Sequence, residues 1–417
     1  MSAEDGRELE SARWYHGMLP REDIQQLLTE DGHFLVRQSE VKIGEGLKTI
    51  LSVRWNGKFH HFVISHEDGR FFIEKYQFDS ISDLIRFYTM KKKPITRRTG
   101  ALIVYGVPKQ HWELHHDQVK LGRLIAEGGF GGIYEALVKI NDRTVKASIC
   151  EEMSLIIRAA VKVHKGRALD KEIIKNICNE ARIMRRYSHP NIVRLYGVAV
   201  GRDPIMVVME HVKDGALDSY LAKRGRWLCI SEKVRMCLDA ASGLEYLHKM
   251  GCIHRDVSAR NCLVQKMRIK ISDFGLSHEI TNNEEKYKLT NLKQKLPIRW
   301  LAPETLMTAT YTTKSDVFSY GILLWEIFMD AAEPYFGMTI AEVNEQVCLF
   351  TTLQCFVQVK SGYRMPAPDC MPKPIQKVMC VYCFVDNPEE RLSMKEIHEY
   401  LQNEYGSLQT EVTVKDT

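Results

Sequence analysis

Apolar and polar positions in residues 1–105 change from a helical to a strand-like pattern and back again. Ile24 and Leu28 recur at the spacing of one helix face, ahead of three short apolar runs. These runs, which are typical of strands, are 34–36, 49–53 and 61–64. Asp68-Gly69 is typical of a hairpin turn, and the apolar spacing over 81–88 predicts a second helix. A small antiparallel sheet between two helices is an α+β sandwich.

A second pattern begins after Gly106 and Pro108, which indicate a linker. Strand-like runs continue to about residue 212, interrupted by one expected helix over 173–187, and the remainder is mostly helical. A small sheet lobe joined to a larger helical lobe predicts a cleft where a ligand binds. The most apolar run, 321–329, contains a glutamate and is shorter than the roughly 20 residues that span a bilayer. We therefore expect a buried helix there and no transmembrane segment.

Composition and charge narrow the class of protein. Apolar residues make up 45% of the 417 residues and charged residues 27%, as in ordinary globular domains. The net charge of +5 is too small to predict nucleic acid as a partner. All eleven cysteines lie from Cys150 onward, several of them singly in apolar runs, which favours buried, reduced thiols in a cytoplasmic protein. Cys380 and Cys383 have the spacing of half a zinc site, but no second pair stands at a matching distance.

Arg37 is the most informative residue of the first segment. It follows the apolar run 34–36, and strand alternation places its side chain on the inner face of the sheet. A buried arginine needs an anionic partner, which is either an internal glutamate or a bound phosphate group. Ser39 two residues on, Arg21 on the first helix and His61 on a neighbouring strand favour the phosphate group.

The first segment resembles the Src-homology-2 (SH2) domain over residues 14 to about 105. The motifs that carry the resemblance are Trp14-Tyr-His-Gly, Phe34-Leu-Val-Arg-Gln-Ser39 and the run Ser80–Tyr88. The resemblance implies that Arg37 grips the phosphate of a phosphotyrosine and that Arg21 flanks its ring. It also implies that Ser39 bonds a phosphate oxygen and that His61 shapes the pocket. Some relatives carry a lysine two positions after the histidine, where this chain has Val63, so contacts to the ring depend more on Arg21.

Motifs of phosphoryl transfer follow in the second segment. A glycine-rich loop lets backbone amides approach phosphates. Its residues are Ile125, Ala126, Glu127, Gly128, Gly129, Phe130, Gly131, Gly132 and Ile133. The later motifs are Ala160-Val-Lys162, Glu180, His254–Asn261, Asp273-Phe-Gly275 and Ala302-Pro-Glu304. Motifs in this order are typical of a protein kinase, although Ala126 replaces the first glycine of the loop pattern.

These residue types fit the chemistry that the resemblance to kinases implies. Transfer of a γ-phosphoryl group needs positioning and charge neutralisation. We expect Asp256 to accept the proton of the substrate hydroxyl group. Asn261 and Asp273 offer oxygen ligands to Mg²⁺, with Mn²⁺ as the alternative ion. Lys162 clamps the nucleotide phosphates once Glu180 holds it.

The same resemblance implies ATP as the nucleotide. Ile125 and Ile133 are expected to cover the adenine from above. The backbone at Glu210 and Val212 is expected to bond its edge, with the Met209 side chain behind it.

The catalytic loop indicates which hydroxyl group is phosphorylated. Serine/threonine kinases usually carry lysine two residues after the catalytic aspartate, where this chain has Ser258. Arg260 instead stands four residues after Asp256, as in tyrosine kinases, and disfavours a dual-specificity enzyme. The segment Pro297–Glu304 also has the tyrosine-kinase form. The chain resembles the Fes/Fer group of non-receptor tyrosine kinases, and the further residues that carry this likeness are 180–184, 187–195, 252–256 and 270–275.

The resemblances predict the organisation of an α+β protein with two domains. We expect an N-terminal tail at 1–13, an SH2 domain at 14–105, a linker at 106–118, a bilobal protein-kinase domain at 119–404 and a C-terminal tail at 405–417. The implied partners are tyrosine-containing protein substrates and phosphotyrosine-containing proteins, and only these partners recruit the chain to membranes. The alternative is a catalytically impaired scaffold that binds phosphotyrosine. Ala126 and two poorly fitting apolar stretches, 146–158 and 348–358, motivate that alternative.

Tyr287 is the predicted regulatory residue. It lies in a polar stretch between Asp273 and Glu304, and Arg255 beside the catalytic Asp256 needs an anionic partner. A phosphate on Tyr287 supplies about −1.5 to −2 charges and several strong acceptors. We therefore expect its phosphorylation to order the loop, against the simpler interpretation of an exposed loop tyrosine.

Overall fold

The computed structural model describes residues 8–41, 45–128, 131–141, 154–164, 171–280, 286–289, 296–336 and 362–415. The chain divides into two compact units, of which the first combines 1–185 with 195–211 and the second combines 186–194 with 212–417. Both units mix helices and strands, which confirms the predicted α+β class. Within the described ranges, none of the helices combines the length and the apolar character that crossing a membrane requires.

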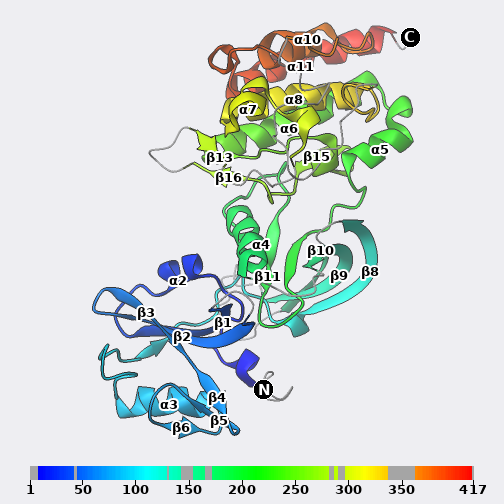
Figure 1. Ribbon diagram of the computed structural model, residues 1–417. Helices are drawn as coiled ribbons and strands as arrows, with labels where there is room; N and C mark the ends of the chain where they lie inside the picture. Colours follow the sequence, from blue (N-terminus) through cyan, green and yellow to red (C-terminus); the bar gives the residue numbers. More distant parts are fainter. Residues whose placement is uncertain are drawn as a thin grey trace, which may run out of the picture. The chain divides into compact units, whose positions relative to one another are not determined.

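The N-terminal part of the first unit is a sheet with one helix on each face, as Figure 1 shows. Its elements are α2 (Arg21–Leu27), β1 (His33–Glu40), β2 (Leu47–Trp55), β3 (Lys58–Val63), β4 (Ser65–Glu67), β5 (Arg70–Phe72), β6 (Gln77–Phe78), α3 (Ile81–Lys91) and β7 (Tyr105–Gly106). Alternation along β1 places Leu35 against Ile24 of α2, while Phe34 and Val36 pack in the cluster that holds Leu84 of α3. The predicted sandwich is therefore confirmed.

The turn and helix boundaries of this part refine the sequence predictions. Asp68-Gly69 joins β4 to β5 with both residues at positive φ, as a two-residue hairpin of the predicted kind requires. Helix α3 runs three residues beyond the predicted end, to Lys91, and Lys92 caps it in the left-handed conformation. In the predicted N-terminal tail, Leu9 and Glu10 are buried, which the acidic character of that segment did not indicate.

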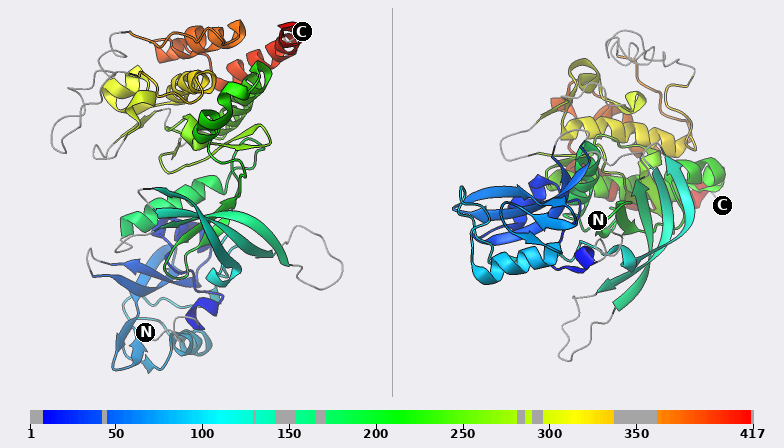
Figure 2. Two further views of the ribbon diagram at one scale, coloured as in Figure 1. Left: turned by 90° about the vertical axis from the view of Figure 1, so that its right-hand side faces the viewer. Right: turned by 60° about the horizontal axis from the view of Figure 1, so that its bottom comes forward.

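A five-stranded sheet forms the rest of the first unit, in the order β11-β12-β10-β9-β8. The elements are η1 (His116–Gln118), β8 (Val119–Gly128), β9 (Gly131–Asn141), β10 (Ser154–His164), α4 (Lys171–Met184), β11 (Leu195–Ala199) and β12 (Met206–Glu210). The long strands β8, β9 and β10 curve side by side in Figure 2. Helix α4 packs against the sheet, because Ile174, Cys178 and Ala181 share a core cluster with Val198 and Val207.

The second unit is mostly helical. Its elements are α5 (Leu217–Arg224), η2 (Gly225–Trp227), α6 (Ile230–Lys249), β13 (Cys252–Ile253), η3 (Ala259–Asn261), β14 (Cys262–Gln265), β15 (Arg268–Ile271), β16 (His278–Glu279), β17 (Tyr287–Lys288), η4 (Ile298–Trp300), α7 (Pro303–Thr308), β18 (Thr310–Tyr311), α8 (Thr313–Phe328), α10 (Lys373–Lys377), the π-helix η5 (Val378–Cys383), η6 (Pro388–Glu390) and α11 (Met394–Lys415). Residues 315–328 of α8 are all buried, which confirms the buried helix predicted over 321–329 up to residue 328, whereas Met329 caps the helix and is exposed. Helix α11 crosses the boundary predicted at 404.

Helix α4 ends earlier than expected. The sequence predicts a helix over 173–187, whereas α4 ends at Met184. The Tyr187 ring is buried instead against Phe274, with ring centroids 5.8 Å apart, and against Tyr246 at 6.1 Å. Because the Tyr187 side chain packs against these rings, residue 187 does not continue helix α4.

Backbone contacts within the first unit join the segment before α2 to the five-stranded sheet. Met18 N donates to Val200 O over 2.8 Å. Gly17 adopts a φ of +58°, and a Cβ on it would lie 2.1 Å from Val200 O, so no larger residue fits. Beside it, His16 is buried with Nδ1 2.8 Å from Glu113 Oε2 and Nε2 3.0 Å from Val107 O.

Candidate functional site

Arg37 lies in the middle of β1 with only 1% of its surface exposed. Its Nε donates to Ser52 Oγ over 3.2 Å, and its Nη1 donates to Leu19 O over 3.3 Å. Both partners are neutral oxygens, and no carboxylate in the described part of the chain forms an ion pair with it. Of the two partners that the sequence left open, the internal glutamate is therefore disfavoured.

The electrostatics around Arg37 suit an anion. Burial and the nearby charge of Arg21, against the opposing effect of Glu22, lower the pKa of Arg37 to about 10. Burial and the charges of Arg37 and Arg21 likewise lower the pKa of His61 to about 4. A cluster in which cations disfavour one another gains most from a dianionic ligand.

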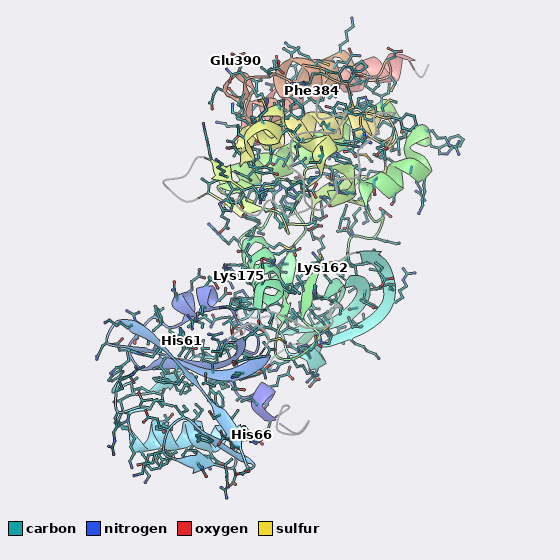
Figure 3. All side chains as sticks on the ribbon, viewed as in Figure 1. His61, His66, Lys162, Lys175, Phe384 and Glu390 are labelled. Carbon is teal, nitrogen blue, oxygen red and sulfur yellow. The ribbon has the colours of Figure 1, made fainter. Side chains whose placement is uncertain are left out.

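Ser52 belongs to this cluster but was not predicted from the sequence. Its Oγ lies 3.0 Å from His61 Nδ1 as well as 3.2 Å from Arg37 Nε, so it links the two predicted residues. Figure 3 labels His61 on β3, next to the strand that carries Ser52. Ser52 lies on a different strand from Arg37, and only the register of β1 and β2 brings them together.

The remaining predicted phosphate ligands lie around this group. Arg21 is the exposed first residue of α2, and its charge acts on both Arg37 and His61. Ser39 is half-buried on β1, two residues beyond Arg37 and thus on the same face of the strand. Arg21, Arg37 and His61 therefore interact electrostatically, and Ser39 shares the face of β1 that carries Arg37.

Lys162 and Glu180 form an ion pair in the first unit. Lys162 Nζ lies 3.0 Å from both carboxylate oxygens of Glu180, which is itself buried. Figure 3 labels Lys162, on β10. Met209, which pairs with Ala160 on the neighbouring strand, packs against the core cluster that contains α4 residues. The predicted pairing of the lysine with the helix glutamate is present.

The glycine-rich segment is carried by the antiparallel strands β8 and β9, whose register shifts between Leu124 and Ala126. Ala126 pairs with Ile133, Glu127 with Gly132 and Gly128 with Gly131. Ala126 is exposed, so its Cβ is accommodated at the edge of the hairpin. The predicted loop residues Gly129 and Phe130 lie outside the described residues, as do 146–153 and 348–358 of the two poorly fitting stretches.

The predicted adenine contacts are divided between the two units. Ile125 is 44% exposed, and Glu210 is the last residue of β12, both in the first unit. Val212 is the residue at which the chain enters the second unit.

The catalytic loop lies in the second unit, between β13 and β14. Arg260 Nη2 donates to Asp256 Oδ1, and Asn261 Nδ2 donates to Asp256 O over 2.9 Å. Asn261 O in turn accepts bonds from Ser272 N over 2.8 Å and Ser272 Oγ over 2.9 Å. The loop is thus fastened to the segment that precedes Asp273.

Asp273 is exposed between two buried residues and adopts a φ of 58°. Gly275 N donates to its Oδ1 over 3.2 Å. Phe274 is buried against His254, with ring centroids 5.3 Å apart. Because Ser272 bonds to Asn261 O, Asp273 is one residue from a direct contact with Asn261. A carboxylate and an amide oxygen are hard oxygen donors, which fits a divalent cation such as Mg²⁺.

Arg255 lies between two tyrosine rings. Its guanidinium carbon is 4.5 Å from the centroid of Tyr287 and 4.3 Å from that of Tyr311. Its Nη1 donates to Leu276 O over 2.8 Å, while Nε and Nη2 are buried without a hydrogen-bond partner in the described ranges. Tyr287 pairs with the buried Tyr311 through β17 and β18, and its ring lies 4.0 Å from that of His278. Tyr287, which is predicted to be phosphorylated, thus contacts Arg255, which is predicted to bind the phosphate group.

Comparison with known proteins adds to this geometry. The family model of protein tyrosine and serine/threonine kinases matches residues 119–401, and that of the SH2 domain matches 14–88. Tyrosine-protein kinase Fer of Rattus norvegicus is 39% identical over 391 residues, which are 93% of this chain and 43% of that protein. Fer-related kinase 1 of Caenorhabditis elegans is 36% identical over 405 residues, covering 96% of this chain and 95% of that protein. The transforming protein Fps of avian sarcoma virus PRCII is 36% identical over 389 residues, covering 93% and 67%. The chain thus spans less than half the length of Fer.

Proposed function

Because the chain belongs to the protein tyrosine and serine/threonine kinases, and within them to the Fer- and Fps-like kinases with an SH2 domain, we propose that it phosphorylates tyrosine residues of proteins. The γ-phosphoryl group of ATP is the group transferred. The observation that carries this proposal is the position of Arg260. It donates to Asp256 and stacks 4.4 Å from the centroid of Trp300, so the base is tied to the segment that supports a substrate tyrosine.

The residues of each unit supply distinct parts of the chemistry. Lys162, held by Glu180, binds the phosphates of ATP as a point charge. Asn261 and Asp273 hold Mg²⁺, or alternatively Mn²⁺, which neutralises charge on the phosphates when bound. Asp256 accepts the proton of the tyrosine hydroxyl group as the tyrosine oxygen bonds to the γ-phosphorus and the bond from that phosphorus to the bridging oxygen of the departing ADP breaks. Arg260 keeps the Asp256 carboxylate oriented toward that proton.

The SH2 domain binds phosphotyrosine-containing proteins and brings the kinase to them. The support for this role is the buried Arg37, whose described partners are neutral oxygens and whose neighbours Arg21 and His61 favour an added anion. We place the activity in the cytoplasm, because Cys178, Cys237 and Cys262 are buried free thiols of the kind that a reducing compartment maintains.

Phosphorylation of Tyr287 is the proposed activating step. The contact of its ring with Arg255, whose Nε and Nη2 are buried without a described hydrogen-bond partner, supports this role. A phosphate at that position provides acceptors for both nitrogens.

The test is a kinase assay on a poly-Glu/Tyr polymer with MgATP. Anti-phosphotyrosine and anti-phosphothreonine antibodies read the product, with a threonine-containing peptide offered in parallel. The expected result is ATP-dependent phosphotyrosine without phosphothreonine. Binding of phosphotyrosine peptide without any transfer would instead establish the catalytically impaired scaffold.

A further inference from the structure

Glu326 is a buried carboxylate next to the catalytic loop. Only 4% of its surface is exposed, on helix α8. Its Oε2 accepts a hydrogen bond from Ala259 N over 3.0 Å and another from Trp300 Nε1 over 3.0 Å. One oxygen atom thus joins the catalytic loop to the segment 297–300.

The same face of α8 also binds backbone groups of these two segments. Asp316 accepts bonds from His254 N over 2.7 Å and from Arg255 N over 2.9 Å, where the catalytic loop begins. Ser319 Oγ donates to Trp300 O over 2.7 Å, two helical turns before Glu326. Asp316 therefore fixes the start of the loop, whereas Glu326 alone of these three residues contacts both the loop and the Trp300 side chain.

A path of contacts runs from Glu326 to the base. Glu326 fixes the indole of Trp300, and the Arg260 guanidinium lies on that ring. Arg260 then donates to the Asp256 carboxylate. A shift of the indole therefore displaces the arginine that orients the base.

We propose that Glu326 is a positioning residue for phosphoryl transfer to tyrosine, which sets the place of Asp256 relative to the platform around Trp300. The proposal rests on the proposed function and extends it to a residue that touches neither nucleotide nor substrate.

The charge of Glu326 gives this role a measurable signature. Burial raises the pKa of Glu326 to about 7, while its two hydrogen bonds and the charge of Arg260 on the catalytic loop oppose the rise. Asp218 on α5 adds to the rise, and Cys262 on β14 also faces the carboxylate. Hydrogen bonds to an ionised acceptor are roughly twice as strong as those to a neutral one. The hold on Ala259 and Trp300 therefore tightens as the pH rises through neutrality.

The first test compares full-length wild type with Glu326→Gln, which keeps an acceptor oxygen but cannot ionise. The wild-type kcat/KM for the poly-Glu/Tyr polymer is divided by that of the variant. Because the other ionisations cancel in this ratio, it reports the ionisation of Glu326 alone. We expect this ratio to rise from near one at about pH 6 to roughly tenfold at about pH 8. The KM for ATP, measured at each pH, should stay within about twofold of wild type, because Glu326 contacts neither Lys162 nor Asp273.

The matched control is Asp239→Asn. Asp239 is also buried, and its Oδ2 also accepts one backbone bond, from Ile269 N over 3.0 Å, and one side-chain bond, from Arg268 Nε over 2.7 Å. It lies on α6, and its printed bonds go to Arg268 and Ile269 of β15 instead of the catalytic loop, so its variant should lower the melting temperature without a pH-dependent ratio. A ratio for Glu326→Gln that does not change with pH, or the same rise in the control, overturns the proposal.

A second variant keeps the test decisive if Glu326→Gln is unstable. Trp300→Phe removes the indole donor but leaves a ring beneath Arg260. We expect it to raise the polymer KM severalfold without changing the KM for ATP. In the double variant with Glu326→Gln, the losses should be smaller than the product of the single ones. An unchanged polymer KM for Trp300→Phe contradicts the proposal, whereas absence of tyrosine phosphorylation by wild type would contradict the proposed function itself.

Discussion

Arg182 and Asp23 form a two-pronged ion pair within the first unit: Nε donates to Oδ1 over 2.9 Å and Nη2 to Oδ2 over 2.8 Å. Asp23 is buried on α2 of the SH2 domain, and Arg182 lies on α4, two residues beyond Glu180. The pair therefore ties the SH2 helix to the helix that holds Lys162 through Glu180.

Asp23→Asn should weaken this tie. Removing one partner of a buried, bidentate pair should lower the free energy of unfolding by about 1–3 kcal/mol. It should also lower kcat/KM for a soluble peptide severalfold, because α4 then holds Glu180 less firmly. The control is Lys175→Gln, since the Lys175–Glu22 pair joins the same helices but its side chains are 57% and 45% exposed. Equal activity of the two variants would show that α4 does not depend on the ion pair.

Arg37→Ala should abolish the function of the phosphate pocket. The lost charge-assisted bonds should weaken binding of a phosphotyrosine peptide about a hundredfold or more, measured by titration calorimetry. Ser52→Ala should weaken it by about tenfold, because Arg37 and His61 lose the hydroxyl group that joins them. Phosphorylation of a short soluble peptide should persist in both variants. Unchanged peptide affinity in Arg37→Ala would refute the pocket assignment.

His61 predicts a dependence of stability on pH. Its pKa is about 4 in the folded protein and 6.5 as an ordinary imidazole, so the unfolded chain binds more protons between these values. The stability from a neutral His61 is therefore present above about pH 6.5 and lost as the pH falls toward about 4. Melting curves of wild type and His61→Gln should diverge in that window, and a phosphotyrosine peptide should reduce the difference because a dianion favours the protonated ring. Parallel melting curves across the window would contradict this assignment.

Asp256→Asn should separate binding from chemistry. The side chain keeps its shape but cannot accept the substrate proton, so transfer should fall by roughly 10²–10⁴ while nucleotide affinity stays near that of wild type. Lys162→Arg should also be nearly inactive, because a planar fork does not replace a point charge at the phosphates. Single-turnover assays and a fluorescent nucleotide measure the two properties. Wild-type turnover by Asp256→Asn would exclude it as the base.

Tyr287→Phe should lower activity severalfold after incubation with ATP, because the ring still stacks on Arg255 but cannot be phosphorylated. Mass spectrometry of wild type should find autophosphorylation concentrated on Tyr287. Tyr311 offers the matched comparison, since it touches the same arginine but is buried and should remain unmodified. If Tyr287→Phe equals phosphorylated wild type in activity, Tyr287 is not the switch.

Local patterns in the sequence were enough to predict the strand that carries Arg37, the hairpin at Asp68-Gly69 and the Lys162–Glu180 pair. Alternation is a property of neighbouring residues, and motif order can be read along the chain, so neither needs a structure to be recognised. Ser52, Asp23 and Glu326 were not predicted as site residues, because each acts through register or packing that joins distant segments. A serine in a strand, an aspartate in the first turn of a helix and a glutamate in an apolar helix have no local signal for those contacts.

Gly17 restricts which other SH2 domains could replace the one in this chain. The backbone there passes so close to Val200 that even an alanine would collide with its carbonyl oxygen, and the neighbouring Met18 is bonded to that same oxygen. A foreign SH2 domain grafted in its place must therefore reproduce this glycine and its left-handed turn. The SH2 domain is thus joined to the five-stranded sheet by a close backbone contact. Replacing it with another SH2 domain would disrupt this contact, whichever peptide the new domain binds.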